Sequence, residues 1–513
     1  MIRRRRFLQT GTAVLTAAPA LPALAAPHQL TPRQAAAHAL NRVGFGPRPG
    51  DLDNVSRDPR GWIDQQLRPG TEPLPPSLAA RLDESRFTQG DVIEAVRELV
   101  TRIRENQAQQ AQGTAVDETR PENPVRLLAR SYQLPAIESR LFRALESPRQ
   151  LEEAMVDFWF NHFNVFQGKS WLRVMVGHYE HNAIRPHALG RFRDLLGAVA
   201  HHPAMLYYLD NWQSVGPQAQ SRGRGLNENY ARELMELHTL GVDGGYTQQD
   251  VTQLARMLTG WTMPARAYAV GGVPAGSTAA GIPAASGAFV FNARLHDNGE
   301  KTWMGHRVES AGQAEGEFAL DVLARHPSTA RHIAFKLVQH FVSDQPDPAL
   351  VDKLASVFLA QDGQIVPVLR ALFASDAFWS QANVGTKFKT PYHYCVSTLR
   401  AGGWGVRTGG PLAVHLATQG MPLYGCPTPD GYKTTESAWL SADGMNKRLE
   451  YASQVASGRL GPERLAGGMP PAELADQLGP LVTPATRSLA LESEAQPAVA
   501  LAMLLAGPGM MRR

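Results

Sequence analysis

The feature that most constrains the fold of this chain is the stretch 227–262, in which a helical periodicity stops at a turn and then resumes. It reads NENYARELMELHTLGVDGGYTQQDVTQLARMLTGWT. At 100° per residue, the apolar side chains of its first half share one broad face. Gly241 and the apolar residue after it are typical of a helix stop, and Thr247 with Asp250 resembles a capping box. We predict a helix, a turn and a second helix, with the functional site built against them.

The polar face of the first helix carries the candidate chemistry. Glu228, Arg232 and Glu236 follow i, i+4, i+8 spacing, so Arg232 can lie between two carboxylates. A solvated helix face with weak surface ion pairs remains the alternative, and His238 falls within the apolar arc, as a core histidine would. The candidate catalytic carboxylates are Glu228, Glu233 and Glu236, and the candidate substrate-binding residues are Asn227, Asn229 and Arg232.

A second informative stretch, residues 155–166, reads MVDFWFNHFNVF and is rich in aromatic residues. Asp157, Asn161 and Asn164 form a polar stripe along this otherwise apolar helix, and His162 lies beside it. Buried polar groups need partners, because leaving one unpaired costs about 1–3 kcal/mol. The stripe is therefore either a structural network or one wall of a pocket. For the second case we predict His162 as catalytic, Asn164 as substrate-binding and Asp157 as a metal ligand.

Two further segments supply candidates. A helix that begins at Pro203 ends near Asp210, a candidate substrate-binding residue. Apolar residues at 289–291 and 301–304 flank His296-Asp297-Asn298-Gly299, which indicates a β-hairpin with an Asn-Gly turn. His296 and Asp297 near its tip are candidate metal ligands, with solvated turn residues as the alternative. A hard divalent metal held by oxygen ligands is one hypothesis, and the cofactor stays open.

The rest of the chain favours helices broken by Pro and Gly, without the alternation of strands and helices that marks an α/β fold. We predict a mainly α protein, with a single large helical domain over 27–513, one small β-hairpin and long ordered loops. Residues 264–287, rich in Gly, Ala and Pro, are expected to form a mobile excursion. Cys395 and Cys426 either form one disulfide or remain two buried thiols.

The first 26 residues, MIRRRRFLQTGTAVLTAAPALPALAA, have the composition of an export signal. Arg4-Arg5-Arg6-Phe7-Leu8 fits the twin-arginine pattern, which predicts export to the periplasm or beyond. Four of the 51 basic residues lie in this signal, which leaves 47 against 47 acidic residues. The mature chain therefore lacks the basic footprint of a nucleic-acid-binding protein. No later stretch has the roughly 18 apolar residues of a transmembrane segment.

Several stretches together resemble a bacterial family known only as a domain of unknown function, number eighteen hundred in its series. The similar stretches follow the same order along the mature chain: HALNRVGFGPRPGDL, FWFNHF, NENYARELMELHTLGVDGGYTQQDV, HDNGEKTWMG, HPSTARHIAFKLVQHFV, FKTPYHYCVSTLRA and PTPDGYKTTESAWLS. His393 departs from the pattern, since relatives often carry Glu there. The resemblance implies an exported, mostly helical protein and assigns no catalytic residue. Relatives are often encoded beside a second exported family that resembles sulfatases and alkaline phosphatases.

Two functions follow from these observations. The first is a periplasmic or secreted enzyme, a hydrolase that uses carboxylates and histidines, with or without a metal, on an envelope or extracellular polymer. The alternative is a non-catalytic helical module that binds a polysaccharide or an exported sulfatase- or phosphatase-like partner. The sequence lacks the G-x-S-x-G, H-E-x-x-H and phosphate-loop motifs, which disfavours serine hydrolases, zincins and P-loop enzymes.

Overall fold

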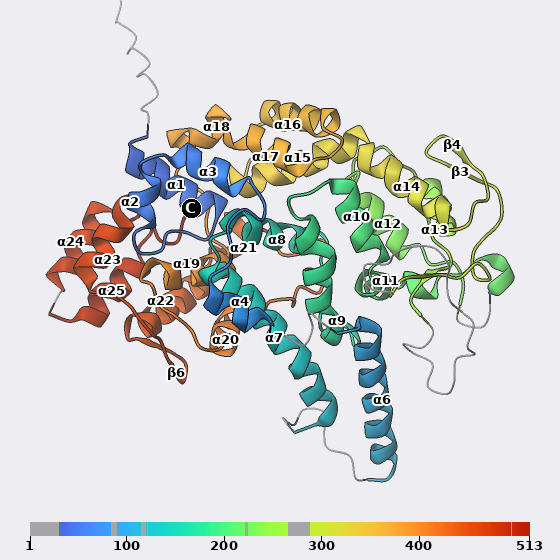
Figure 1. Ribbon diagram of the computed structural model, residues 1–513, viewed down its shortest axis with the longest axis horizontal. Coiled ribbons are helices and arrows are strands. Elements are labelled where there is room, and N and C mark those ends of the chain that lie inside the picture. Colours follow the sequence, from blue (N-terminus) through green and yellow to red (C-terminus); the bar gives the residue numbers. More distant parts are fainter. Residues whose placement is uncertain are drawn as a thin grey trace, which may run out of the picture.

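The protein is described here by a computed structural model that covers residues 30–83, 90–113, 120, 122–220, 224–264, 288–493 and 495–513. Helices dominate the molecule (Figure 1), and the predicted mainly α class is confirmed. The predicted export signal, residues 1–26, lies outside the described residues. So does all but the first residue of the predicted excursion, 264–287.

Local capping signals explain where the N-terminal helices begin. The Thr31 hydroxyl accepts a hydrogen bond from the Gln34 amide, and the Gln34 side chain accepts one from the Thr31 amide, which makes a capping box in front of α1. Asp58 caps α3 by accepting a hydrogen bond from Gly61. The helices of this region are α1 (Pro32–Val43), α2 (Asp51–Val55), α3 (Pro59–Gln66) and α4 (Pro76–Asp83).

Two long helices, α6 (Val92–Ala111) and α7 (Pro124–Glu146), pack side by side and project from the body at the bottom of Figure 1. Asn123 begins α7, because its side chain accepts hydrogen bonds from the first two amides of the helix. At their root both helices pack against α9 (Leu172–Tyr179). We call α6 and α7 the arm.

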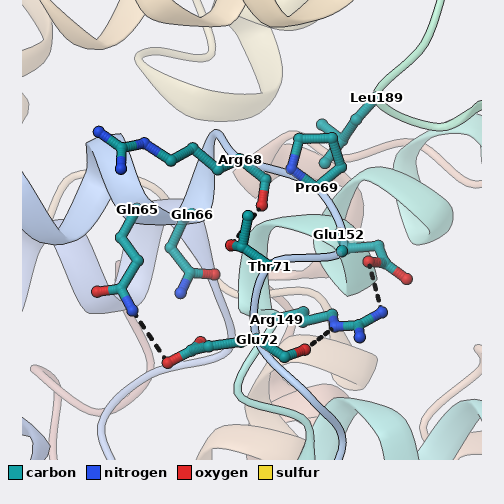
Figure 2. Close-up of a pocket in the computed structure, with 10 residues that line it drawn as sticks. Gln65, Gln66, Arg68, Pro69, Thr71, Glu72, Arg149, Glu152 and Leu189 are labelled. Carbon is teal, nitrogen blue, oxygen red and sulfur yellow. Dashed lines mark hydrogen bonds and ion pairs between the residues drawn. The ribbon is translucent and has the colours of Figure 1, made fainter.

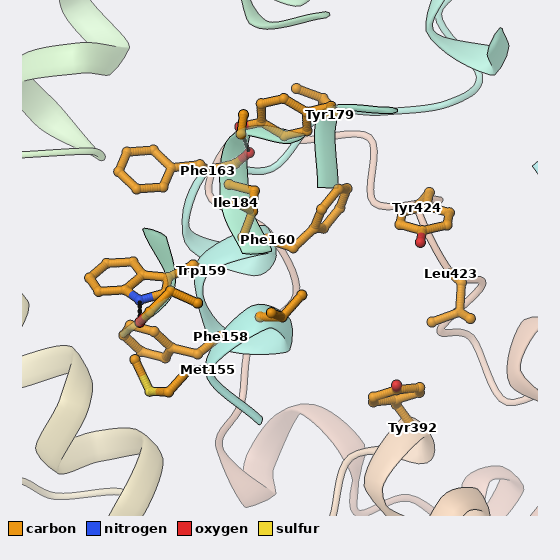
Figure 3. Packing of buried hydrophobic residues seen from close by; sticks show 14 of the residues in the cluster. Met155, Phe158, Trp159, Phe160, Phe163, Tyr179, Ile184, Tyr392, Leu423 and Tyr424 are labelled. Carbon is orange, nitrogen blue, oxygen red and sulfur yellow. Dashed lines mark hydrogen bonds between the residues drawn. The ribbon is translucent and has the colours of Figure 1, made fainter. Parts of the chain in front are cut away.

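Helix α8 (Gln150–His162) runs through the core, as its aromatic composition predicts. Phe160 packs edge-on against Tyr179 and Tyr424, with ring centroids 5.9 and 5.0 Å apart (Figure 3). The Trp159 indole donates a hydrogen bond to the Ala188 carbonyl at 2.9 Å. After α9 the chain makes one π-helical turn, η1 (Glu180–Ile184), and one 3-10 turn, η2 (Arg185–His187).

The predicted helix–turn–helix is confirmed as α12 (Asn229–Glu236) and α13 (Gln248–Met257). Thr247 and Asp250 form the expected capping box, and Gly241 has a positive φ of 86°. Helix α12 ends earlier than the sequence pattern indicates, with Leu237 as its C-cap. The preceding elements are α10 (Phe192–His201), α11 (Pro203–Tyr208), η3 (Asn211–Gln213) and η4 (Pro217–Ala219).

The predicted hairpin across His296–Gly299 is wrong, because its two strands pair elsewhere. β2 (Val290–Phe291) pairs with β1 (Trp261–Thr262), and β3 (Lys301–Trp303) pairs with β4 (His306–Val308). The β3–β4 turn consists of Met304 and Gly305, both at positive φ, which matches the twist of a two-residue hairpin. In the described part of the chain the remaining sheet is the short pair β5 (Arg459–Leu460) and β6 (Glu463–Arg464).

The C-terminal half is helical throughout and closes on the N-terminal helices. Its last helices lie beside α1 and α2 in Figure 1, and one hydrophobic cluster reaches from Ala39 to Met511. Its elements are α14 (Gln313–Arg325), α15 (Pro327–Phe341), α16 (Pro348–Ala360), α17 (Ile365–Phe373), α18 (Asp376–Trp379), η6 (Gln381–Asn383), α19 (Pro391–Ala401), α20 (Gly410–Thr418), α21 (Glu436–Trp439), α22 (Ala442–Ala456), α23 (Pro471–Leu478), η7 (Gly479–Leu481), α24 (Pro484–Glu492) and α25 (Pro497–Leu505).

Two expectations about the chemistry of the chain can be compared with this fold. Cys395 and Cys426 are both buried and free, so they do not form a disulfide with each other. Within the described ranges, no helix combines the length and the apolar composition that a membrane crossing requires.

Candidate active site

The polar stripe of α8 holds a distant loop, residues 422–433, against the core. Asn161 exchanges two hydrogen bonds of 2.8 Å with the backbone of Tyr432. Asn164 donates to the carbonyls of Cys426 and Thr428 at 3.0 and 2.8 Å. Gly431 permits this approach, since a Cβ there would lie 2.2 Å from the Asn161 carbonyl oxygen. Two asparagines thus fix the loop that carries Asp430.

The fixed loop brings Asp430 near α11 and α12. Tyr208, the last residue of α11, donates a hydrogen bond to the Pro427 carbonyl at 2.8 Å. Burial raises the pKa of Tyr208, and the nearby Cys426, Glu233 and Asp430 raise it further. Glu233 and Asp430 therefore both act on one buried tyrosine.

The environments of Glu233 and Asp430 shift their pKa values in opposite directions. Burial raises the pKa of the half-buried Glu233, and the charges of Glu236 and Asp430 add to that effect. Burial alone would raise the pKa of Asp430, but hydrogen bonds from Lys433 and Thr428 hold it below its usual value. The Lys433 ammonium lies 2.6 Å from the Asp430 carboxylate. Two carboxyl groups separated in this way are suited to act as an acid and a base.

A lysine on α15 completes the Glu233–Asp430 site, which we define as Glu233, Asp430, Lys336 and Tyr208. The side chain of Lys336 makes no hydrogen bond or ion pair with any residue in the described ranges. Burial and the charge of Lys433 lower its pKa to about 8, and Asp430 opposes this shift. Lys336 therefore supplies an amine that no residue of the described ranges neutralises by direct contact.

Three neutral histidines lie behind this lysine. The ring centroid of His162 is 6.1 Å from those of His238 and His332. His162 Nε2 donates to the His238 carbonyl at 3.1 Å, so its Nδ1 carries the lone pair, which is buried without a partner among the described residues. Burial and Lys336 lower the pKa of His238 to about 3 and that of His332 to about 4.

The structure brings four of the predicted residues to this region: His162, Asn164, Glu233 and Glu236. Asn164 positions the 422–433 loop. Glu236 raises the pKa of Glu233. His162 packs with His238 and His332 in a group that we call the histidine layer, and its buried ring lies behind the site.

The other predicted residues of the 227–262 stretch have contacts of their own. Glu228 accepts hydrogen bonds from Thr252 at 2.6 Å and Gln248 at 2.8 Å. Arg232 pairs with Glu228 at 3.3 Å, but no ion pair joins it to Glu236. Asn227 accepts a hydrogen bond from the Asn229 amide, and Asn229 donates to the Leu209 carbonyl. Asp210 pairs with Lys169 at 2.7 Å.

The predicted metal ligands are engaged in separate ion pairs. Asp157 pairs with Arg140, and Asp297 pairs with Arg256 at 2.7 Å. His296 is fully buried, 3.0 Å from Glu315, and does not lie at an exposed hairpin tip. Across the described ranges, no three His, Cys, Asp or Glu side chains are arranged to hold a metal ion. The donor set predicted from the sequence therefore does not assemble.

Asp157 belongs to a second, closed set of charges, the Arg140 network, which consists of Arg140, Glu153, Asp157, Glu180 and Arg185. Arg140 bridges Asp157 and Glu180, lying 2.8 Å from the latter. Arg185 binds both oxygens of Glu153 at 3.0 and 2.9 Å. Tyr424 donates to Glu180 at 3.1 Å. Every carboxylate of this network has a cationic partner.

Two pockets near the Arg140 network are weaker candidates. The pocket in Figure 2 holds only about 10 Å³, room for one water. Its polar side chains pair with each other, as Gln65 does with Glu72 at 3.0 Å. A larger pocket of about 360 Å³ lies against Glu152 and Arg185, which pair at 3.5 Å. Arg68 of the first pocket forms no ion pair with a described residue, but it is exposed, whereas Lys336 is half-buried.

Sequence reasoning missed Asp430, Lys336, His332 and Tyr208. One signal was available: His332, Lys336 and His340 recur at i, i+4, i+8 along one face of helix α15. The role of Asp430 depends on hydrogen bonds to asparagines more than 260 positions earlier in the chain, which a local pattern does not indicate.

The fold and this region define a mainly helical protein with a partly buried cluster of two carboxyl groups, a lysine and a tyrosine in its body. The chain matches the model of a family described as "Protein of unknown function (DUF1800)" over residues 38–512, and it belongs to that family. No curated protein and no solved structure gives a significant match. The buried ring of His393 contacts Arg513, whose Nη1 lies 2.7 Å from His393 Nε2.

Proposed function

We propose that this protein is an exported hydrolase that cleaves a glycan of the envelope or the extracellular matrix. The observation that carries the proposal is the opposite shift of two pKa values within one site: the pKa of Glu233 is raised by burial and by the charges of Glu236 and Asp430, and that of Asp430 is lowered by hydrogen bonds from Lys433 and Thr428. Glycoside hydrolysis requires a protonated and an ionised carboxyl group on either side of the scissile bond.

In the proposed reaction, Glu233 donates its proton to the leaving glycosidic oxygen as the bond from the anomeric carbon breaks. Asp430 accepts a proton from the water that attacks the anomeric carbon. The products are two hydroxyl-terminated chains; Asp430 then releases its proton to solvent, and Glu233 regains one from it. Tyr208 and Asn164 act as positioning residues, because they hold the loop that carries Asp430.

The test is a cleavage assay on a panel of envelope and extracellular glycans, with new reducing ends as the readout. Glu233→Gln and Asp430→Asn should each lower kcat/KM by about 10²–10⁴-fold, the usual contribution of a general acid or base. Glu473→Gln on the exposed face of α23 is the matched control and should change the rate less than about twofold. Full activity of both site variants, or no cleavage of any glycan by the wild-type protein, would contradict the proposal.

Export by the twin-arginine route is a separate part of the proposal and rests on the Arg4-Arg5-Arg6-Phe7-Leu8 motif. Replacement of Arg4 and Arg5 by Lys should keep the full-length protein in the cytoplasm of a host with this pathway. Fractionation and immunoblotting measure the result. Unchanged export of the double variant would assign the protein to another route.

A further inference from the structure

A third pocket, which we call the arm pocket, lies where the arm meets the body. Its volume is about 330 Å³. Helix α7 contributes Arg126 and Gln133, α9 contributes Arg173, and the segment after α8 contributes Phe166 and Gln167. Pro422 and Gly425 close it from the 422–433 loop.

The lining of the arm pocket favours an anion. Two arginines contribute to it and no acidic residue does. Arg173 is half-buried, and its guanidinium forms no ion pair with a described residue. Guanidinium groups recognise carboxylate, sulfate and phosphate through paired hydrogen bonds.

Other parts of the lining are ordered by their own contacts. Gln133 donates to Gln167 at 3.0 Å, and Gln167 donates to the Leu423 carbonyl at 2.8 Å. The Phe166 ring lies over Gly168, where a Cβ would approach its Cζ to 2.2 Å. An aromatic ring beside polar amides offers a flat apolar surface and directional hydrogen bonds to the same ligand.

The arm pocket and the Glu233–Asp430 site both take residues from the 422–433 loop, in which Gly425 precedes Asp430 by five residues. An extended chain of five residues spans at most about 18 Å. A polymer that extends from one site can therefore reach the other within a few repeat units.

From this arrangement we infer that the arm pocket is a subsite for an anionic group, a carboxylate or a sulfate, carried by an acidic polysaccharide. Its role as a subsite of the same polymer rests on the proposed glycan hydrolysis. Its affinity for the anionic polymer depends only on Arg173 and its neighbours, so binding can be measured without turnover.

The experiment measures binding of dextran sulfate, polygalacturonate and neutral dextran to the full chain by affinity electrophoresis at fixed ionic strength. The wild-type protein should bind at least one anionic polymer tightly and dextran weakly, and added salt should weaken the binding. Arg173→Gln should reduce the affinity about tenfold, and Arg173→Lys less, because it keeps the charge but loses the planar fork. The sulfated and carboxylated polymers distinguish the two anions.

The matched control is Arg130→Gln on the exposed face of α7, which should leave the affinity within about twofold of wild type. Thermal unfolding of each variant checks that it is folded. Equal binding by wild-type protein and Arg173→Gln, an equal loss in Arg130→Gln, or tighter binding of anionic phospholipid vesicles than of either polymer would overturn the inference. The binding measurement requires no turnover, so a failure of the hydrolase proposal is seen separately in the cleavage assay.

Discussion

The Arg140 network and the Glu233–Asp430 site are two charged regions that differ in how their charges are paired. Helix α8 contributes Asp157 to the network, and its Asn161 holds the loop that carries Asp430. In the network, Arg140 bridges two carboxylates and Arg185 binds both oxygens of Glu153. In the site, Lys336 has no direct partner among the described residues, and Glu233 and Asp430 have pKa values shifted apart. The carboxylates of the network are all paired within it, whereas Lys336 of the site has no direct partner among the described residues.

This difference separates structural from functional charge. A buried charge that is fully paired holds elements in register, and loss of one partner leaves the other uncompensated. Titratable groups with shifted pKa values and no complete set of partners are those that exchange protons or bind ligands. Damage to the network should therefore lower stability, whereas damage to the site should change titration and activity.

The largest expected effect is the loss of Arg140. Arg140→Met leaves Asp157 without its guanidinium partner in the core and should lower the free energy of unfolding by about 3–5 kcal/mol. Denaturant unfolding measures the change. Arg130→Met on the exposed face of the same helix is the control and should cost less than about 0.5 kcal/mol. A similar small loss for Arg140→Met would mean that the network is not structural.

The next effect is a loss of stability in acid that originates in the histidine layer. The folded-state pKa values of His238 and His332, about 3 and about 4, lie below the unfolded value of about 6.5. The unfolded chain therefore binds more protons below pH ~6.5, and the free energy of unfolding falls as the pH drops from about 6.5 toward 4.

Each such histidine contributes a slope of about 1.4 kcal/mol per pH unit in this window. His238→Gln should reduce the slope by that amount, as measured by denaturant unfolding at a series of pH values. The exposed His306→Gln should leave it unchanged. A slope that His238→Gln does not alter would show that His238 is already protonated in the folded protein.

A smaller effect is expected from Lys336. Lys336→Met removes a cation that lowers the pKa of His332, so that pKa should rise from about 4 while burial keeps it below 6.5. The free energy of unfolding should not fall, because no ion pair is broken. NMR titration of the imidazole and denaturant unfolding measure both quantities. A destabilisation as large as that of Arg140→Met would show that Lys336 stabilises the fold.

The sequence predicts local features of this molecule better than distant contacts. Capping by Thr247 and the helix start at Pro203 depend on neighbouring residues, and the structure has both as predicted. The hairpin across His296–Gly299 failed because Phe291 pairs with Trp261, thirty residues earlier. His296 is buried because Thr259 and Glu315 enclose it.

The Glu233–Asp430 site shows the same limit: residues on local helices were predicted, and residues placed by distant contacts were not. Glu233 and His162 were predicted from their helices, and both lie in the site region. Asp430 was not predicted, since its position depends on Asn161 and Asn164 holding a loop that a periodicity argument leaves unplaced. The 227–262 stretch thus contributes Glu233 to the candidate site, while Lys336 and Asp430 come from much later parts of the chain.

The most direct test of the central claim is an NMR titration of the side-chain carboxyl carbons of Glu233 and Asp430 in the folded protein. The pKa of Glu233 should lie above the ordinary value of about 4.3, and that of Asp430 below about 3.9, with each assigned by Glu233→Gln and Asp430→Asn. Between the two values, Glu233 is protonated and Asp430 ionised, as an acid–base pair requires. Ordinary values for both carboxyl groups would contradict the assignment of this region as an acid–base site.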